Sequence, residues 1–291
     1  MALASAGCAA STDSEAEGPS PEAPIGTARD AIQGGTSDDA DRAVVGLAVT
    51  DNEGYLAKTC SGVLIAPNLV LTAQHCIAST ADFVDCETST FGPPVDAVQV
   101  YVTTDASMWT SATTWLPVAE IFVPPGGDGV CGRDLALVRL VLTVDDARPL
   151  EPRLDVPSEL AETYAAVGFG ATSGEGGGAG VRRRRDGLHV MCVGPTCSTS
   201  EIDGREWRGD HGICNGDSGS PAIDGDGRVF GITSRGPSGC DDPIYGGLVA
   251  DRGWISRVAV HAADAGRYAA AAWADAAAGD GNVGSNGTAL E

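Results

Sequence analysis

The stretch from residue 212 to residue 221, GICNGDSGSP, constrains this chain of 291 residues more than any other. It holds Ser218 between Gly216, Asp217 and Gly219. Glycines permit a tight turn in which the amides of Gly216 and Ser218 point at one spot while the serine hydroxyl faces a substrate carbonyl. A nucleophile of acyl transfer needs this arrangement, with the two amides as its oxyanion hole. The same residues also suit an ordinary turn, so other stretches must decide.

Two further stretches supply the partners that such a serine needs. LTAQHC, residues 71–76, places His75 after an apolar run, and RDLALVRL, residues 133–140, places Asp134 at the head of a segment that would bury it. A serine hydroxyl needs a neutral imidazole to take its proton and a buried carboxylate to hold that imidazole in the right tautomer. The sequence therefore predicts His75, Asp134 and Ser218 as the catalytic residues. This chemistry requires no cofactor and no metal.

Together the three stretches resemble the TAAHC, DIALLRL and GDSGGP motifs of the trypsin/chymotrypsin-like serine proteases, in the same chain order, and the similarity runs from about Ile32 to Ile255. The resemblance implies an all-β fold of two antiparallel β-barrels with a C-terminal helix. It also implies a serine endopeptidase that acts on proteins or peptides through an acyl-enzyme. We divide the chain into a signal remnant, linker and propeptide (1–31), the protease domain (32–260), and a helix end with a disordered tail (261–291). The alternative is a catalytically silent, protease-like binding module at the cell envelope.

The resemblance extends to the groups that activate such an enzyme and bind its substrate. IQGG, residues 32–35, is similar to the IVGG that begins the mature family members, although alanine rather than Arg or Lys precedes it. An activating protease would free an ammonium at Ile32, which is expected to pair with Asp217. Gly212, Ser234 and Gly236 correspond to substrate-binding positions, and arginine follows Ser234 where the family usually has tryptophan.

The pocket for the substrate side chain departs from that of trypsin. An aspartate usually stands six positions before the nucleophile, but here that position is Gly212, followed by Ile213, and the wall position aligns with Ile244 or Pro243. A charged side chain would lose its solvation there without gaining a partner. We expect cleavage after small or medium uncharged residues, unless the loop at Asp241–Asp242 folds inward and supplies a charge.

Nine cysteines indicate an oxidising, extracytoplasmic compartment. The resemblance implies two disulfides, Cys60–Cys76 and Cys214–Cys240. Four other cysteines have no such anchor, and bonds from Cys86 to Cys131 and from Cys192 to Cys197 would close them, but the sequence leaves this pairing open. A zinc site is the alternative for two of them, although its spacing fits no standard pattern; its ligands would be His189, Cys192, Cys197 and His211.

The net charge and the N-terminal residues limit the classes of partner that this chain can bind. The net charge of −22 argues against nucleic acid, and no apolar run is long enough for a transmembrane helix. ALASAGC resembles the cleavage region of a bacterial lipoprotein signal, which makes Cys8 a lipidation candidate and the only expected membrane contact. The arginines at 182–185 suit a solvated strand face, an anionic partner or a proteolysis site.

Periodicity indicates the local structure. In AVQVYVT, Val98, Val100 and Val102 alternate with other residues and predict a half-buried strand. PAIDGDGRVFGITS, residues 221–234, predicts a hairpin around an Asp-Gly-Asp-Gly turn. The alanine-rich stretch from Trp254 to residue 278 predicts a helix with a break at Gly266.

Overall fold

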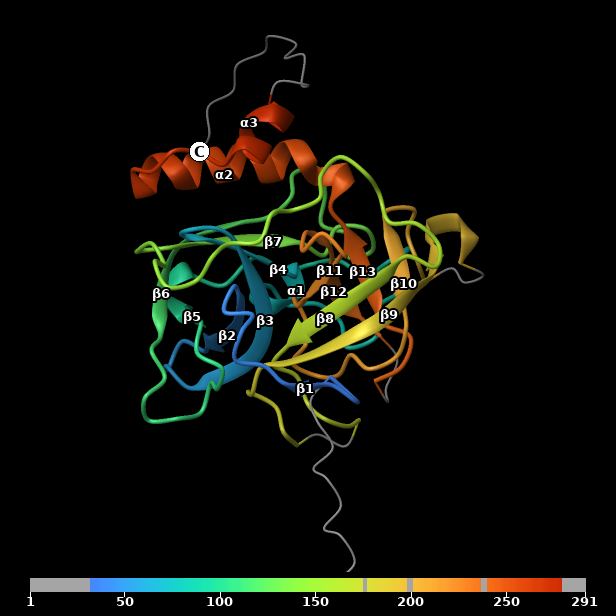
Figure 1. Cartoon of the computed structure of the whole chain (residues 1–291), viewed down its shortest axis with the longest axis horizontal. Coiled ribbons are helices and arrows are strands. Elements are labelled where there is room, and N and C mark those ends of the chain that lie inside the picture. Colours follow the sequence, from blue (N-terminus) through green and yellow to red (C-terminus); the bar gives the residue numbers. More distant parts are fainter. Residues whose placement is uncertain (1–31, 175–176, 198–200, 237–239, 279–291) are drawn as a thin grey trace, which may run out of the picture.

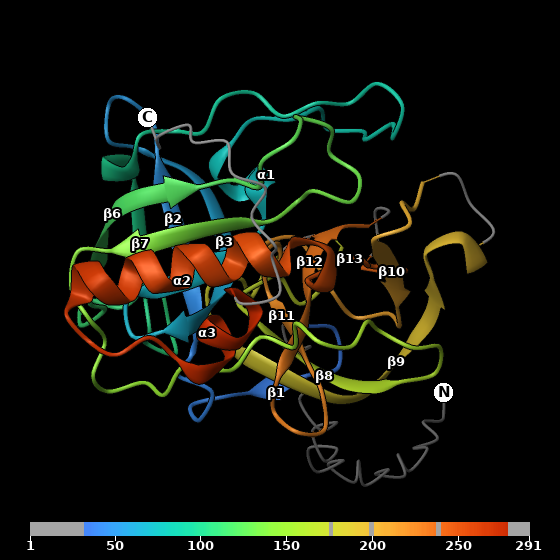
Figure 2. The same cartoon turned by 90° about the horizontal axis from the view of Figure 1, so that it is seen from above.

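The computed structural model describes residues 32–174, 177–197, 201–236 and 240–278. Two β-barrels lie side by side, and the C-terminal helices pack across one end of the pair (Figures 1 and 2). The all-β fold of two antiparallel barrels with a C-terminal helix is confirmed. The expected signal remnant, linker and propeptide, Cys8 and the C-terminal tail after residue 278 lie outside the described residues.

The first barrel closes in the order β2-β3-β4-β7-β6-β5. Its strands are rich in valine, isoleucine and leucine, whose β-branched or bulky side chains fill the interior of a small barrel. The tripeptide turn η1 (Ala97–Gln99) precedes β5, and the short helix α1 (Gln74–Ile77) follows β4. The strands are β2 (Val44–Thr50), β3 (Leu56–Ala66), β4 (Leu69–Thr72), β5 (Val100–Thr103), β6 (Leu116–Phe122) and β7 (Ala136–Leu140).

The second barrel runs β9-β10-β13-β12-β11-β8 and closes through pairing of β8 with β9, while β1 (Thr36–Ser37) adds to the edge of β9. Its core is aromatic, because the Trp207 ring stacks on Tyr245 with centroids 4.1 Å apart and on Phe230 at 5.1 Å. The expected hairpin is confirmed as β11 and β12. The strands are β8 (Thr163–Gly168), β9 (Arg183–Val193), β10 (Glu206–Gly209), β11 (Pro221–Ile223), β12 (Val229–Arg235) and β13 (Ile244–Gly247), with the turn η2 (Gly194–Thr196) after β9.

The C-terminal segment forms η3 (Val249–Asp251), α2 (Arg252–Gly266) and α3 (Ala272–Ala278). The predicted break at Gly266 is confirmed, because α2 ends there and Arg267 adopts the left-handed conformation. Trp254, Ile255 and Val258 bury one face of α2 against the first barrel. The helix crosses the boundary drawn between residues 260 and 261, and that division stays a prediction. No helix of the described residues combines the length and the apolar character that a membrane span needs.

The strand expected around Val98 begins later than predicted. Val100 and Val102 are fully buried in β5, but Val98 lies in η1 and is 75% exposed. The side chain of Gln99 accepts a hydrogen bond from the Asp96 amide and donates to the Thr50 carbonyl. These bonds tighten the chain into a turn before the strand, so side-chain hydrogen bonding overrides the alternation of apolar residues there.

The interpretation of the four arginines as a solvated strand face is wrong for Arg182. Its guanidinium is buried, pairs with Asp38 and donates to the carbonyls of Val44 and Thr104. A buried guanidinium needs hydrogen-bond acceptors, and Asp38 with these two carbonyls supplies them to Nε and Nη1. Arg184, on β9, pairs with acidic residues of this chain rather than standing free for an anionic partner.

Four disulfides join described cysteines. They link Cys60 to Cys76, Cys86 to Cys131, Cys192 to Cys197 and Cys214 to Cys240. These are the pairs named from the sequence. The bond between Cys192 and Cys197 removes the thiolates that the zinc alternative required.

Candidate active site

Strand pairing brings the predicted histidine and aspartate together. β4 and β7 are antiparallel neighbours with Thr72 opposite Ala136. The chain leaves β4 into α1, which carries His75, and reaches Asp134 just before β7, so both residues lie at the same end of the strand pair. His75 Nδ1 lies 2.7 Å from Asp134 Oδ2, and the His75 amide donates to Asp134 Oδ1 at 2.9 Å. The carboxylate thus holds both the ring and the backbone of the histidine.

Asp134 is buried with 1% exposure and has a third partner, Ser234. The Ser234 hydroxyl donates to Asp134 Oδ2 at 2.6 Å. Burial alone would raise the pKa of Asp134, but the charge and hydrogen bonds of His75, together with the bond from Ser234, hold it below its ordinary value. Sequence reasoning placed Ser234 in the substrate groove and missed this hydroxyl, for which no local signal exists.

Ser218 projects from a turn that two glycines make possible. Gly216 and Gly219 have φ values of +97° and +82°, a region that favours glycine. A Cβ on Gly219 would lie 2.2 Å from both the Ser61 carbonyl and the Thr72 hydroxyl of the first barrel. The Ser61 amide donates to the Ser218 carbonyl at 2.8 Å. The nucleophile turn therefore rests directly on the strands that lead to His75.

The amides of this turn differ in whether they have an intramolecular acceptor. Asp217, Gly219 and Ser220 donate to backbone carbonyls at 2.8 to 3.0 Å. Within the described part of the chain, the amides of Gly216 and Ser218 have no acceptor. Two unpaired donors beside a serine hydroxyl leave room for an anionic oxygen.

His75, Asp134 and Ser218 line one cavity of about 580 Å³ between the barrels. No hydrogen bond among the described residues joins the His75 ring to the Ser218 hydroxyl, a contact that often tightens only when substrate binds.

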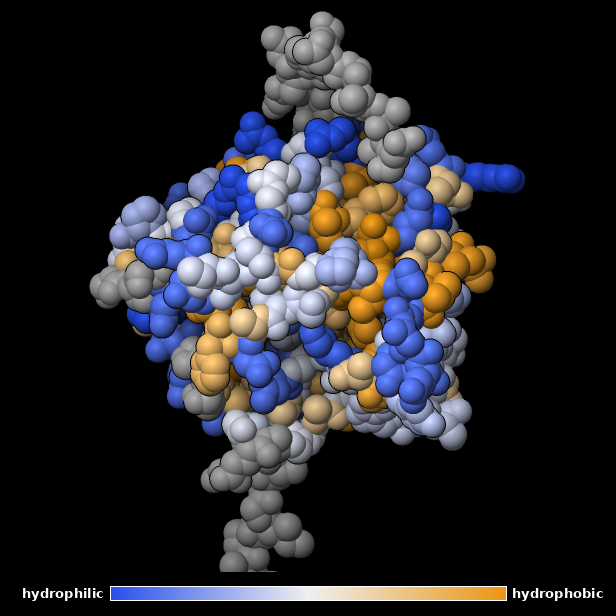
Figure 3. Space-filling view, turned by 180° about the vertical axis from the view of Figure 1, so that it is seen from behind, coloured by the Kyte–Doolittle hydropathy of each residue, from blue (hydrophilic) through white to orange (hydrophobic). Residues whose placement is uncertain are grey.

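α1 lies on the far side of Figure 1, and Figure 3 shows this far face with apolar residues gathered in a band over the first barrel. The first-barrel lining also includes Lys58, Thr80, Ala81, Asp82, Phe83, Val84 and Val130, and the second-barrel lining includes Ile213, Asn215, Ser234, Arg235, Gly236 and Pro243.

Lys58 is the only lysine of the chain, and sequence reasoning did not single it out. Its ammonium donates to the His75 carbonyl at 2.5 Å. Burial lowers the pKa of Lys58, while the charge of Asp134 acts in the opposite direction. Long-range pairing of β3 places this cation at the cavity, which a sequence pattern does not reveal.

Asp217 is fully buried beneath the turn. Asp217 Oδ1 accepts from the Gly170 amide at 2.8 Å and Oδ2 from the Cys214 amide at 3.0 Å. Burial raises the pKa of Asp217 to about 7, and these bonds together with the charge of Arg183 offset only part of the effect. Ile32 is also fully buried, in the core of the second barrel, but no hydrogen bond or ion pair of the described residues joins it to Asp217.

The structure decides which of the expected residues line the pocket for the substrate side chain. Ile213 and Pro243 line the cavity, whereas Ile244 lies in β13 and pairs with neighbouring strands. The residues Asp241–Asp242 are exposed and do not line it. Of the two alignments for the pocket wall, only Pro243 faces the cavity.

The backbone conformation at Gly212 disfavours any residue with a side chain. Gly212 has a φ of +123°, and a Cβ there would lie 2.5 Å from Arg185 Nη1. That guanidinium donates to the carbonyls of Gln33 and His211 at 2.6 and 3.0 Å. A cation, and not a carboxylate, therefore lies against this position.

One group of described residues has the spacing of a metal site: Cys60, His75 and Cys76. The two sulfur atoms are joined in a disulfide, and metal binding needs thiolates. The group therefore does not fit a metal.

Comparisons with known proteins agree with this geometry. A family model described as Trypsin matches residues 32–252. Kallikrein 1-related peptidase b8 of Mus musculus is 28% identical over 228 residues, which cover 72% of this chain and 82% of the relative. Brachyurin of Leptuca pugilator is 30% identical over 192 residues, covering 62% and 78%. A solved structure of neuropsin, a serine protease expressed in the limbic system of mouse brain, covers 77% of this chain and 98% of its own, with a TM-score of 0.58 at 20% identity.

Proposed function

This chain belongs to the trypsin family of serine proteases, and from that premise we propose that it is a serine endopeptidase acting on proteins or peptides through an acyl-enzyme. The observation that carries the proposal is the hydrogen-bonded pair of His75 and Asp134 in one cavity with Ser218. None of the three residues that the chemistry needs is replaced.

In the proposed mechanism each residue has one role. His75 Nε2 takes the proton of the Ser218 hydroxyl as its oxygen attacks the substrate carbonyl, and then gives that proton to the leaving amine. Asp134 accepts from Nδ1, which fixes the tautomer and stabilises the imidazolium that forms. Water then attacks the acyl-enzyme in the same way and releases the acid. No step calls for a cofactor.

We assign the oxyanion hole to the amides of Gly216 and Ser218. Their lack of acceptors among the described residues supports this role, because the amides of Asp217, Gly219 and Ser220 in the same turn all donate to backbone carbonyls. Donors that are already oriented need no reorganisation as charge develops, and each such donor lowers a barrier by about 3 to 4 kcal/mol.

Activation by cleavage before Ile32 is supported by the burial of Asp217. Among the described residues its carboxylate accepts two amide bonds and feels the charge of Arg183, but it forms no direct ion pair. A fully uncompensated buried charge costs about 3 to 5 kcal/mol, and a new ammonium at Ile32 would remove the part of that cost that remains for Asp217. An activating protease is therefore part of the proposal, and Asp217 with Ile32 is its activation pair.

Substrate choice is proposed to exclude basic side chains. Gly212 offers no carboxylate, Arg185 lies behind it, and Ile213 and Pro243 give the cavity an apolar wall. Uncharged residues such as Ala, Val, Leu or Met are the proposed side chains before the scissile bond. The backbone of that substrate would pair along Ser234 to Gly236, as in the family.

The place of action is proposed to be extracytoplasmic. Four disulfides among the described residues fit an extracellular protein. Attachment through a lipid on Cys8 is the finer proposal, and the mass of the purified mature protein reports on it together with the N-terminus.

Labelling with a fluorophosphonate tests the function directly, because the reagent bonds only to an activated serine. Protein cleaved before Ile32 is expected to be labelled, and the Ser218→Ala variant is not. Protein with an intact triad that stays unlabelled after this cleavage would instead support the silent binding module.

A further inference from the structure

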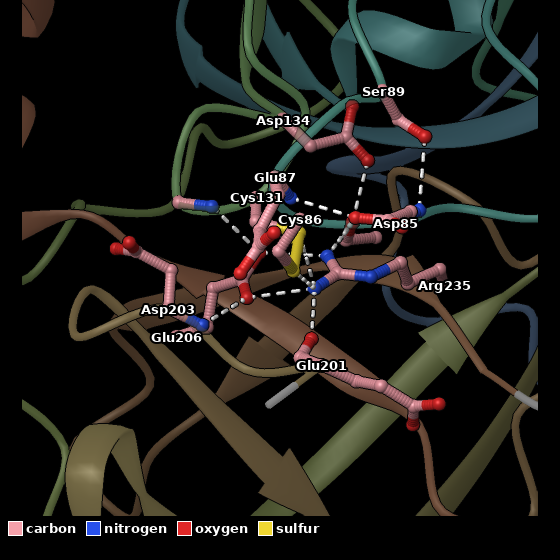
Figure 4. Close-up of a disulfide and its surroundings, with 12 residues drawn as sticks. Asp85, Cys86, Glu87, Ser89, Cys131, Asp134, Glu201, Asp203, Glu206 and Arg235 are labelled. Carbon is pink, nitrogen blue, oxygen red and sulfur yellow. Dashed lines mark hydrogen bonds and ion pairs between the residues drawn. A yellow bond between two sulfur atoms is a disulfide. The ribbon is translucent and has the colours of Figure 1, made fainter. Parts of the chain in front are cut away.

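A second cluster lies beside the proposed catalytic residues, where Arg235 at the end of β12 meets Glu206 at the start of β10 (Figure 4). Arg235 Nη1 donates to Glu206 Oε1 at 2.7 Å, and Nη2 donates to Oε2 at 2.8 Å. The Glu206 side chain is fully buried and that of Arg235 is 15% exposed. Nη2 also donates to the Glu201 carbonyl at 2.6 Å. A bidentate ion pair of this kind fixes the orientation of the guanidinium plane.

This ion pair joins the two barrels next to Asp134. The amide of Gly132, on the first-barrel segment that leads to β7, donates to Glu206 Oε1 at 2.8 Å. Arg235 Nη2 lies 3.2 Å from the Sγ of Cys131, which is held in a disulfide. Glu206 and Arg235 therefore contact Gly132 and Cys131, which lie two and three residues before Asp134.

The guanidinium also reaches the carboxylate through one hydroxyl. Arg235 Nη1 donates to Ser234 Oγ at 3.2 Å, and Ser234 Oγ donates to Asp134 Oδ2 at 2.6 Å. A guanidinium has donors only, so its bond to Ser234 occupies a lone pair and leaves the hydroxyl proton for Asp134. Two hydrogen bonds thus connect a cation to the residue that orients His75.

We propose that Arg235, held in place by Glu206, is a positioning residue that acts through Ser234. It fixes the Ser234 hydroxyl as a donor to Asp134, so that this carboxylate keeps the geometry that holds His75. The inference rests on the proposed endopeptidase. It adds a residue that the resemblance does not supply, because the family usually has tryptophan after the serine.

Arg235 also lines the cavity, so a direct contact with substrate is the competing account. A small acyl ester with no residue beyond the one before the scissile bond separates the two. A positioning role slows such an ester and a longer peptide alike, whereas a substrate contact affects only the peptide.

The experiment compares the cleaved parent with Arg235→Lys, Ser234→Ala and the double variant. Lysine keeps the positive charge, which avoids leaving Glu206 buried and uncompensated, but it cannot bind both carboxylate oxygens and Ser234 together. Fluorophosphonate titration counts competent sites, so rates per site are unaffected by protein that fails to fold. Arg42→Lys is the matched control, because Arg42 forms an exposed pair with Asp146.

Arg235→Lys is expected to lower the acylation rate per site on the order of 10-fold for both substrates, with the ester KM within about threefold. In the Ser234→Ala background the same change is expected to alter the rate by less than about twofold, since the route to Asp134 is already broken. Full additivity, an unchanged rate per site, or a loss confined to the peptide would overturn the positioning role. An inactive parent would refute the endopeptidase itself, whereas an active parent with these negative results refutes only the role of Arg235.

Discussion

The buried carboxylate of Asp217 makes folding stability depend on pH in a way that one substitution removes. The perturbation is Asp217→Asn in the uncut chain, made in a Ser218→Ala background so that no self-cleavage intervenes. Asp217 is fully buried, and burial raises its pKa to about 7 although two amides donate to it. The unfolded chain exposes the same carboxyl to water, where its pKa is near 3.9.

The size and sign of the change in unfolding free energy with pH follow from this difference in pKa. Below about pH 4 the carboxyl is protonated in both states, so burial costs little. As the pH rises toward 7 the unfolded chain loses its proton while the folded chain keeps it, and the free energy of unfolding falls. About three pKa units at 1.36 kcal/mol each give a loss of roughly 4 kcal/mol, which is complete above pH 7. Asparagine has no such slope, and its lost acceptor adds only an offset that does not depend on pH.

Urea unfolding of parent and variant at five pH values between 4 and 8 measures the effect. The difference in unfolding free energy, variant minus parent, is expected to grow by roughly 3 kcal/mol between pH 4 and 7 and to approach roughly 4 kcal/mol by pH 8, because all other groups cancel in it. Asp226→Asn is the control, since Asp226 is 83% exposed, and its difference should change by less than about 0.5 kcal/mol. Parallel curves for Asp217→Asn and its parent would refute the reasoning. Protein cut before Ile32 is expected to lose most of the slope.

Three further outcomes are expected. Alanine at His75 or Ser218 should each lower turnover by about 10⁵- to 10⁶-fold, and the double change by hardly more, as measured on a peptide substrate; clearly additive losses would argue against a shared proton transfer. Replacing Cys60 and Cys76 by alanine should lower the unfolding free energy by about 3 kcal/mol in urea titrations, and an unchanged midpoint would contradict this. A peptide library should show cleavage after uncharged residues, and a dominant preference for Arg or Lys would show that the pocket at Gly212 has been misjudged.

The sequence by itself determined the fold class, and it named three residues that the structure brings to one cavity. Short motifs at 71–76, 133–140 and 212–221 resemble those of a known family, and that resemblance implied two barrels with His75, Asp134 and Ser218 between them. Local signals sufficed for the hairpin of β11 and β12 and for the end of α2 as well. Such features depend on neighbouring residues, whose chemistry the sequence displays directly.

Only the tertiary structure decided what depends on distant segments meeting. Pro243 rather than Ile244 lines the cavity because of the register of β13. Arg182 can be buried because Asp38, which is distant in the sequence, forms an ion pair with it. The partnership of Arg235 with Glu206 joins residues on different strands, and neither one carries a motif. Side-chain partners across a barrel are set by strand order and register, which local patterns do not encode.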